Sequence, residues 1–158
     1  MELPRKILIG NDVIYQLGTF IRDLNHNATI VVVISGNTVK TRVGKEGMEA
    51  LDSSSLKHKW IETPKASMKG INSSQLIIKK EQPDFIIGLG GGRSVDVAKM
   101  ISFNLNIPFI SVPTSASHDG ISSPFVSIRG RDKPYSLKAH APIGVIADTK
   151  LISEAPYR

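Results

Sequence analysis

The chain has 158 residues, about the size of one domain, and 41% of them are hydrophobic against 22% charged. This composition is typical of a globular protein that buries a core. The longest apolar run, residues 30–34, is too short to span a bilayer, and the first residues lack the layout of a signal peptide. The absence of cysteine excludes disulfides, thiolate catalysis and cysteine-ligated zinc, and a cytoplasmic location is expected.

The chain is basic, with 20 Lys and Arg residues against 14 Asp and Glu residues and a net charge of +6. This surplus suits an anionic partner such as a nucleotide, a phosphorylated metabolite or a nucleic acid. The charges are dispersed and aromatic residues make up only 6%, so a stacking platform for nucleic acid is not expected. An ordinary solvated basic surface would explain the charge equally well.

Helix and strand patterns alternate in the first half of the chain. Asn11 is placed to cap a helix whose apolar face consists of Ile14, Leu17, Ile21 and Leu24. The β-branched run at residues 29–34 is typical of a strand buried on both faces of a parallel sheet. The pattern then predicts a helix across residues 39–51, a strand at 59–63 and a helix over 67–81 that ends before a proline.

The alternation continues in the second half. Apolar runs predict strands at residues 84–89, 108–113 and 143–147, and a helical face spans residues 95–105. Residues 125–128 and 135–138 flank a turn-forming stretch and predict a hairpin. A last helix is expected to begin at Asp148 or Thr149. We therefore predict an α/β fold, a doubly wound, Rossmann-like and mostly parallel sheet, in a single domain of residues 1–158.

The strongest motif is Gly-Leu-Gly-Gly-Gly-Arg-Ser-Val-Asp at residues 88–96, between a predicted strand and a predicted helix. Adjacent glycines let a ligand approach the backbone, and a helix start offers unpaired N–H groups and the positive end of its dipole. Together they favour a pyrophosphate site, to which Arg93 could add a charge-assisted contact. The spacing is neither G-x-G-x-x-G nor a Walker loop, so a plain strand-to-helix turn is the alternative.

A second motif, Pro-Thr-Ser-Ala-Ser-His-Asp-Gly-Ile-Ser-Ser-Pro at residues 113–124, directly follows a predicted strand. Ligands of open α/β sheets bind along the edge where the strands end. Thr114, Ser115 and Ser117 offer hydroxyls, and His118 with Asp119 is the only adjacent His–Asp pair in the chain. The alternative is an ordinary surface loop.

The residues of both motifs carry a specific resemblance. Residues 90–99 resemble the G-G-G-x-x-x-D-x-x-K signature of the superfamily of iron-containing alcohol dehydrogenases, glycerol dehydrogenases and dehydroquinate synthases. Residues 113–124 resemble its sn-glycerol-1-phosphate dehydrogenase branch in particular, and residues 144–149 and 155–158 match the end of that branch's first domain. The resemblance implies an NAD(P)-dependent interconversion of dihydroxyacetone phosphate and sn-glycerol 1-phosphate for archaeal-type lipids.

The resemblance also implies which residues bind which ligand. Asp119 would contact the hydroxyls of the phosphorylated polyol substrate. The residues implied for the dinucleotide are Gly91, Gly92, Arg93, Ser94, Val95, Asp96, Thr114, Ser115, Ala116, Ser117 and Ser123.

The turn after the strand at residues 29–34 bears on the choice between NAD and NADP. It contains no carboxylate that would repel a 2′-phosphate, and Lys40 and Arg42 follow closely. Asn37 could hydrogen-bond a ribose hydroxyl without repelling a phosphate. The sequence therefore predicts binding of both NAD(H) and NADP(H) with affinities within about tenfold. Ordinary surface residues of a helix are the alternative.

A divalent metal, usually zinc, is implied as the Lewis acid that polarises the substrate oxygen. By resemblance its ligands, an Asp and two His, lie in a second, helical domain that this chain is expected to lack. Asp148 fits a helix cap better than a metal ligand. No catalytic residue or metal ligand is therefore assigned, and we expect a truncated domain that binds its cofactor without turnover.

Two other functions stay open. The chain could be a non-catalytic nucleotide-binding module, or a domain of a glycerol dehydrogenase or a dehydroquinate-synthase-like enzyme. Downstream metal ligands and phosphate dependence would separate these alternatives. The expected partners are a dinucleotide and a small phosphorylated polyol, with neither nucleic acid nor a membrane span, and a homo-oligomer is compatible with the sequence.

Overall fold

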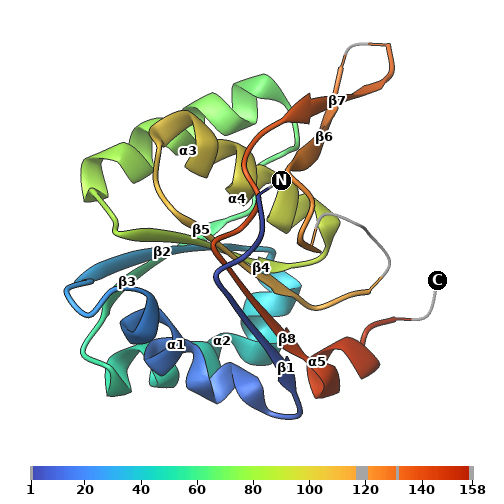
Figure 1. The fold of residues 1–158 in the computed structure, drawn as a ribbon. Helices are drawn as coiled ribbons and strands as arrows, with labels where there is room; N and C mark the ends of the chain where they lie inside the picture. The colour runs from blue at the N-terminus through green and yellow to red at the C-terminus, as the bar shows by residue number, and fades with distance from the viewer. Residues whose placement is uncertain (1, 117–120, 131, 157–158) are drawn as a thin grey trace.

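The computed structural model describes residues 2–116, 121–130 and 132–156. Its centre is a six-stranded sheet in the order β1-β8-β5-β4-β2-β3, and every neighbouring pair is parallel (Figure 1). The strands are β1 (Lys6–Gly10), β2 (Ile30–Ser35), β3 (Lys57–Glu62), β4 (Phe85–Gly90), β5 (Phe109–Pro113) and β8 (Gly144–Asp148). The parallel, doubly wound α/β prediction is confirmed.

The central strands are buried on both faces because their sequences are almost entirely apolar. All six residues of β4 and all five of β5 are buried, and so are five of the six residues of β2. A parallel strand covered on both sides has no solvent-facing side and therefore no polar alternation. This pattern made the three strands recognisable in the sequence.

Helices cover the two faces of the sheet in two layers (Figure 1). The 3-10 turn η1 (Val13–Gln16), α1 (Leu17–Leu24) and α2 (Asn37–Ser53) pack on one face, with Phe20 and Leu51 in the shared core. On the other face lie α3 (Met68–Glu81) and α4 (Gly92–Leu105), with Ile71 and Ile101 in the second core. The short α5 (Thr149–Ser153) follows β8.

The hairpin predicted in the second half is also confirmed. Strands β6 (Phe125–Arg129) and β7 (Pro134–Lys138) pair antiparallel and form a separate two-stranded sheet. Figure 1 shows this hairpin projecting from the α4 side of the molecule. Val126 and Ile128 are buried in the second core, so β6 packs against α4.

Near the N-terminus one strand was not predicted and one predicted helix cap is wrong. β1 was not recognisable because this edge strand is short and its Ile7 and Ile9 remain 57% and 67% exposed. Asn11 does not cap a helix. η1 begins after Asp12, whose backbone is in the left-handed conformation, and α1 begins only at Leu17. The residues at these two helical starts, Asp12 and Gln16, make no capping hydrogen bond with their own side chains.

The cap expected at Asp148 is confirmed. Its carboxylate accepts hydrogen bonds from the N–H groups of Lys150 at 3.0 Å and Leu151 at 3.3 Å. The same carboxylate also accepts from the N–H groups of Asp12 at 3.3 Å and Ile14 at 3.1 Å. One buried side chain therefore ends β8, starts α5 and fixes η1.

Among the described residues, no helix is both long and apolar enough to cross a bilayer.

Candidate functional site

A crevice opens between β2 and β4, which are neighbours in the sheet but lead into helices on opposite faces. β2 leads into α2 on the first core, whereas β4 leads into α4 on the second core. The chains therefore diverge beyond the ends of these two strands. Ligands of doubly wound sheets bind at such a switch point.

A cavity of about 570 Å³ lies at this position. Its walls come from four segments far apart in the sequence: the start of α2, the start of α4, the end of β5 and the segment after α5. The lining residues are Gly36, Thr38, Val39, Arg42, Gly91, Gly92, Arg93, Ser94, Thr114, Ser115, Ala155 and Pro156. Both sequence motifs thus contribute to one cavity.

Two helix N-termini open into the cavity. Gly36 caps α2 and Gly91 caps α4, and neither helix has a side-chain cap on its first-turn N–H groups. Apart from its chain neighbours, a Cβ added at either glycine would meet nothing within 4 Å in the part of the chain that the structure describes, so both caps face open space. Uncapped N–H groups and two positive dipole ends suit an anion, and Arg93 and Arg42 add charge. These residues fit a dinucleotide pyrophosphate.

The glycines of the turn before α4 have distinct structural roles. Gly90 has a φ of 147°, a backbone conformation that other L-residues rarely adopt. A Cβ at Gly88 would lie 3.0 Å from the Cβ of Ala98, so this glycine lets α4 pack closely on β4. The N–H of Thr114 donates to the carbonyl of Gly90 at 2.9 Å. The turn and the end of β5 are therefore fixed against each other.

A buried hydroxyl pair fixes the start of α4 from the other side. The Oγ atoms of Thr63 and Ser94 lie 2.7 Å apart, and both residues are buried. Thr63 directly follows β3, and its N–H also donates to the carbonyl of Ser35 at the end of β2. Thr63 could not be selected from the sequence, because the contact depends on the order of the strands.

Six of the predicted cofactor residues lie together in the cavity wall. They are Gly91, Gly92, Arg93, Ser94, Thr114 and Ser115. Five others lie outside it, namely Asn37, Val95, Asp96, Ala116 and Ser123. The side chain of Val95 is fully buried in the second core, and its N–H closes the first helical turn on the carbonyl of Gly91. Ala116 is exposed and does not line the cavity.

Asp96 and Ser123 belong to a second set of contacts, which secures the end of the 113–124 motif. The Asp96 carboxylate accepts from the N–H of Ser127 at 3.1 Å. The Lys99 ammonium, buried within α4, donates to the carbonyls of Ser123 at 2.5 Å and Phe125 at 3.2 Å. The hydroxyl of Ser123 accepts from the N–H of Phe125 at 3.1 Å. The helix that starts at the cavity therefore also anchors the far end of this loop.

Asn37 lies between two lining residues, but its side chain is engaged elsewhere. Its amide Nδ2 donates to the Oε1 of Glu62 at 2.9 Å. Glu62 ends β3 and pairs in register with Ser35 of β2. The turn itself lacks a carboxylate, as expected, yet the neighbouring strand supplies one. Ser117, His118 and Asp119 lie outside the described residues, so their expected contacts stay predictions.

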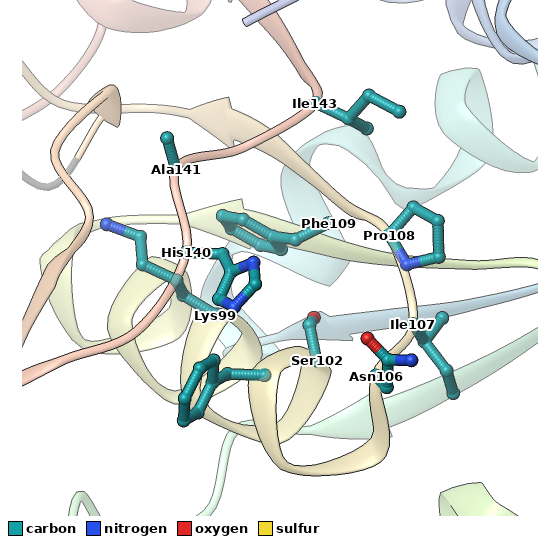
Figure 2. A pocket seen from close by; sticks show the side chains of 10 residues that line it. Lys99, Ser102, Asn106, Ile107, Pro108, Phe109, His140, Ala141 and Ile143 are labelled. Atoms are coloured by element: carbon teal, nitrogen blue, oxygen red, sulfur yellow. The ribbon is translucent and has the colours of Figure 1, made fainter. Parts of the chain in front are cut away.

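A smaller cavity of about 230 Å³ lies at the opposite ends of the strands. Its lining includes Pro108 just before β5, Phe109 at the start of β5, His140 and Ile143 (Figure 2). The Lys99 side chain runs away from Ser102 and Asn106 in this view, toward the carbonyls that it binds. The buried Lys99 ammonium is already engaged with two carbonyls, and no residue of the glycine turn at 88–96 lines this cavity, so it is a poor candidate for the dinucleotide.

Within the ranges that the structure describes, no group of three or more His, Asp or Glu side chains could hold a metal ion. Asp148 was the one aspartate considered as a ligand, and its carboxylate is occupied by four backbone N–H groups. The described residues therefore contain the cavity between α2 and α4 but no metal centre beside it.

Solved structures of dehydrogenases share the fold of this chain. The glycerol dehydrogenase of Schizosaccharomyces pombe superposes with a TM-score of 0.85 at 24% identity, covering 99% of this chain and 40% of that one. The NADH-dependent butanol dehydrogenase A of Thermotoga maritima gives 0.87 at 18% identity, covering 99% and 45%. At these identities the likeness establishes the fold.

Curated relatives match the whole chain at higher identity. Glycerol-1-phosphate dehydrogenase (NAD(P)+) of Nitrosopumilus maritimus is 46% identical over 158 residues, and the enzyme of that name from Methanosarcina acetivorans is 40% identical. The chain spans 44% of the length of each relative. The family model described as iron-containing alcohol dehydrogenase matches residues 8–156. The chain therefore belongs to the iron-containing alcohol dehydrogenase family.

Proposed function

We propose that this chain is the dinucleotide-binding part of an NAD(P)-dependent dehydrogenase that interconverts dihydroxyacetone phosphate and sn-glycerol 1-phosphate. The observation that carries the proposal is the cavity at the β2–β4 switch point, where two uncapped helix N-termini meet. The relatives matched over the full chain, which are named as glycerol-1-phosphate dehydrogenases, support the choice of substrate.

Each wall of the cavity has a role in this proposal. The first-turn N–H groups from Gly92 to Ser94 bind the pyrophosphate, with Arg93 neutralising part of its charge. Gly91 leaves room for the phosphates, and Thr114 and Ser115 line the path toward the nicotinamide. When bound, the nicotinamide supplies the hydride that reduces the substrate carbonyl. Asp119 contacts the substrate hydroxyls by resemblance.

We propose further that turnover requires the metal ligands that the resemblance assigns to a second domain. The 158-residue chain should bind NADH or NADPH with one-to-one stoichiometry in calorimetry. Mixed with NADH, dihydroxyacetone phosphate and zinc, it should oxidise no NADH above the rate without protein. Enzyme-like turnover by the purified chain would contradict the need for a second domain, and absence of binding would contradict the proposed function itself.

A further inference from the structure

We propose that Glu62, at the end of β3, is the residue that disfavours NADP(H) relative to NAD(H) in this cavity. The inference rests on the proposed dinucleotide function and adds the identity of a specificity residue. It starts from an unexpected contact, the hydrogen bond from the Asn37 amide to the Glu62 carboxylate at 2.9 Å.

The sheet order locates the adenosine end of the dinucleotide. β4 carries the glycine turn, β2 lies beside it, and β3 lies beside β2 at the sheet edge. In dinucleotide folds the adenosine ribose lies beyond the strand next to the glycine-turn strand, where an acidic residue commonly contacts its hydroxyls. Here that position is the end of β2, where Gly36 and Thr38 line the cavity on either side of Asn37.

The carboxylate at this position comes from the neighbouring strand. Glu62 and Ser35 are register partners at the ends of β3 and β2, and the Asn37 amide holds the Glu62 side chain against the turn. The residue is exposed, and no cation among the residues that the structure describes forms an ion pair with it. The Glu62 carboxylate therefore lies beside the turn of Gly36 and Thr38, on the β3 side of the cavity.

Arg42, the cation that α2 contributes to the cavity wall, is directed to the other side. The Arg42 guanidinium donates to the carbonyl of Leu151 at 3.4 Å and lies 3.7 Å from the Glu154 carboxylate. Both partners belong to α5 or its end. α5 follows β8, and in the sheet β8 lies on one side of β4 whereas β3 lies on the other. A 2′-phosphate, which carries nearly two negative charges, would thus meet the Glu62 carboxylate rather than the Arg42 cation.

The test compares the dissociation constants of NADH and NADPH within each protein, so that a partial loss of folded protein cancels in their ratio. The unmodified chain should bind both and favour NADH by up to about tenfold. In Glu62→Gln the ratio should shift toward NADPH by at least about fivefold, because the repulsion is removed. Glu49→Gln on α2, an exposed carboxylate outside the cavity, makes the same charge change and should leave the ratio unchanged.

A second variant changes the charge at Asn37, the hydrogen-bond partner of Glu62. Asn37→Asp adds a carboxylate beside Glu62 and should shift the ratio toward NADH. A Glu62→Gln ratio that moves no more than that of Glu49→Gln overturns the inference, while binding of both dinucleotides leaves the proposed function standing. If the unmodified chain binds neither dinucleotide, the proposed function fails and the inference fails with it.

Discussion

The hydroxyls of Thr63 and Ser94 form a buried hydrogen bond of 2.7 Å between the end of β3 and the first turn of α4. Ser94 lines the cavity, so this bond helps to set where the α4 N-terminus lies. It connects the strand carrying Glu62 with the helix that is proposed to bind the pyrophosphate. Stability and cofactor affinity should therefore be coupled at this pair.

A double-mutant cycle at this pair tests whether the two hydroxyls stabilise the fold by interacting with each other. Thr63→Val should lower the free energy of unfolding by about 1–2 kcal/mol, because the Ser94 hydroxyl is left buried without its partner. Adding Ser94→Ala should recover most of that loss, since no unpaired hydroxyl then remains. Urea denaturation of the four proteins measures the cycle. Strictly additive losses would mean that the two hydroxyls do not interact.

Gly91 gives a test of the pyrophosphate site that leaves the fold intact. The Cβ of a substituted residue would meet no protein atom within 4 Å, and the φ of −78° at this position suits any residue. Gly91→Val should therefore fold normally while its side chain occupies the space of the phosphates. We expect NADH affinity to fall at least about hundredfold, or about 2.8 kcal/mol.

Gly36→Val is the matched comparison, because its Cβ also faces open space at the other helix start. It should weaken binding less if α4 holds the pyrophosphate. Calorimetry that finds unchanged affinity in Gly91→Val would contradict the assignment of the phosphates to α4.

Asp148 should matter for stability. Asp148→Ala leaves N–H groups of both η1 and α5 without their acceptor, and we expect a loss of about 2–4 kcal/mol. Asp148→Asn keeps one acceptor oxygen and should lose less. Thermal unfolding with and without added zinc measures the effect. A stabilisation by zinc that disappears in Asp148→Ala would instead support a ligand role.

Asp84 should make stability depend on pH in the acid range. Partial burial would raise the pKa of its carboxyl, but hydrogen bonds from the backbone of Thr29 and Ile30 and from the Thr29 hydroxyl outweigh burial and lower it below 3.8. A carboxyl whose pKa is lower in the folded than in the unfolded state stabilises the fold at pH values above its pKa in the unfolded state. This stabilisation is lost as the pH falls through the pKa of the carboxyl in the folded state.

The variant Asp84→Ala measures this contribution. It should be less stable than the unmodified chain by about 1–2 kcal/mol at pH 7, and the difference should shrink as the pH falls below 3.8. Urea denaturation between pH 7 and pH 3 provides the measurement. A difference that stays constant over this range would contradict a charged Asp84 as the source of the stability.

Local patterns made most of the fold predictable. Runs such as residues 30–34 are so uniformly apolar that burial on both faces was the only satisfactory solution, and the capping chemistry of Asp148 could be recognised beside a strand end. β1 escaped prediction because an edge strand needs few buried residues. Its Leu8 packs on the core while Ile7 and Ile9 stay exposed.

The candidate site was predictable only where its residues follow one another in the chain. The glycine turn and Thr114 with Ser115 were recognised as motifs and lie in one cavity. Glu62 and Thr63 were missed, because their place beside the site follows from the pairing of β3 with β2 and of β2 with β4. The spacing of residues along the sequence does not indicate the order of the strands in the sheet.

The central claim is that the dinucleotide occupies the cavity between the starts of α2 and α4. Backbone amide chemical shifts recorded during an NADH titration of the 158-residue chain test it most directly. The account predicts shifts that saturate together at Gly36, Gly91, Gly92, Ser94 and Thr114, with little change around Phe103 and His140 in the smaller cavity. Shifts centred on Phe103 and His140, with the glycine turn unaffected, would contradict it.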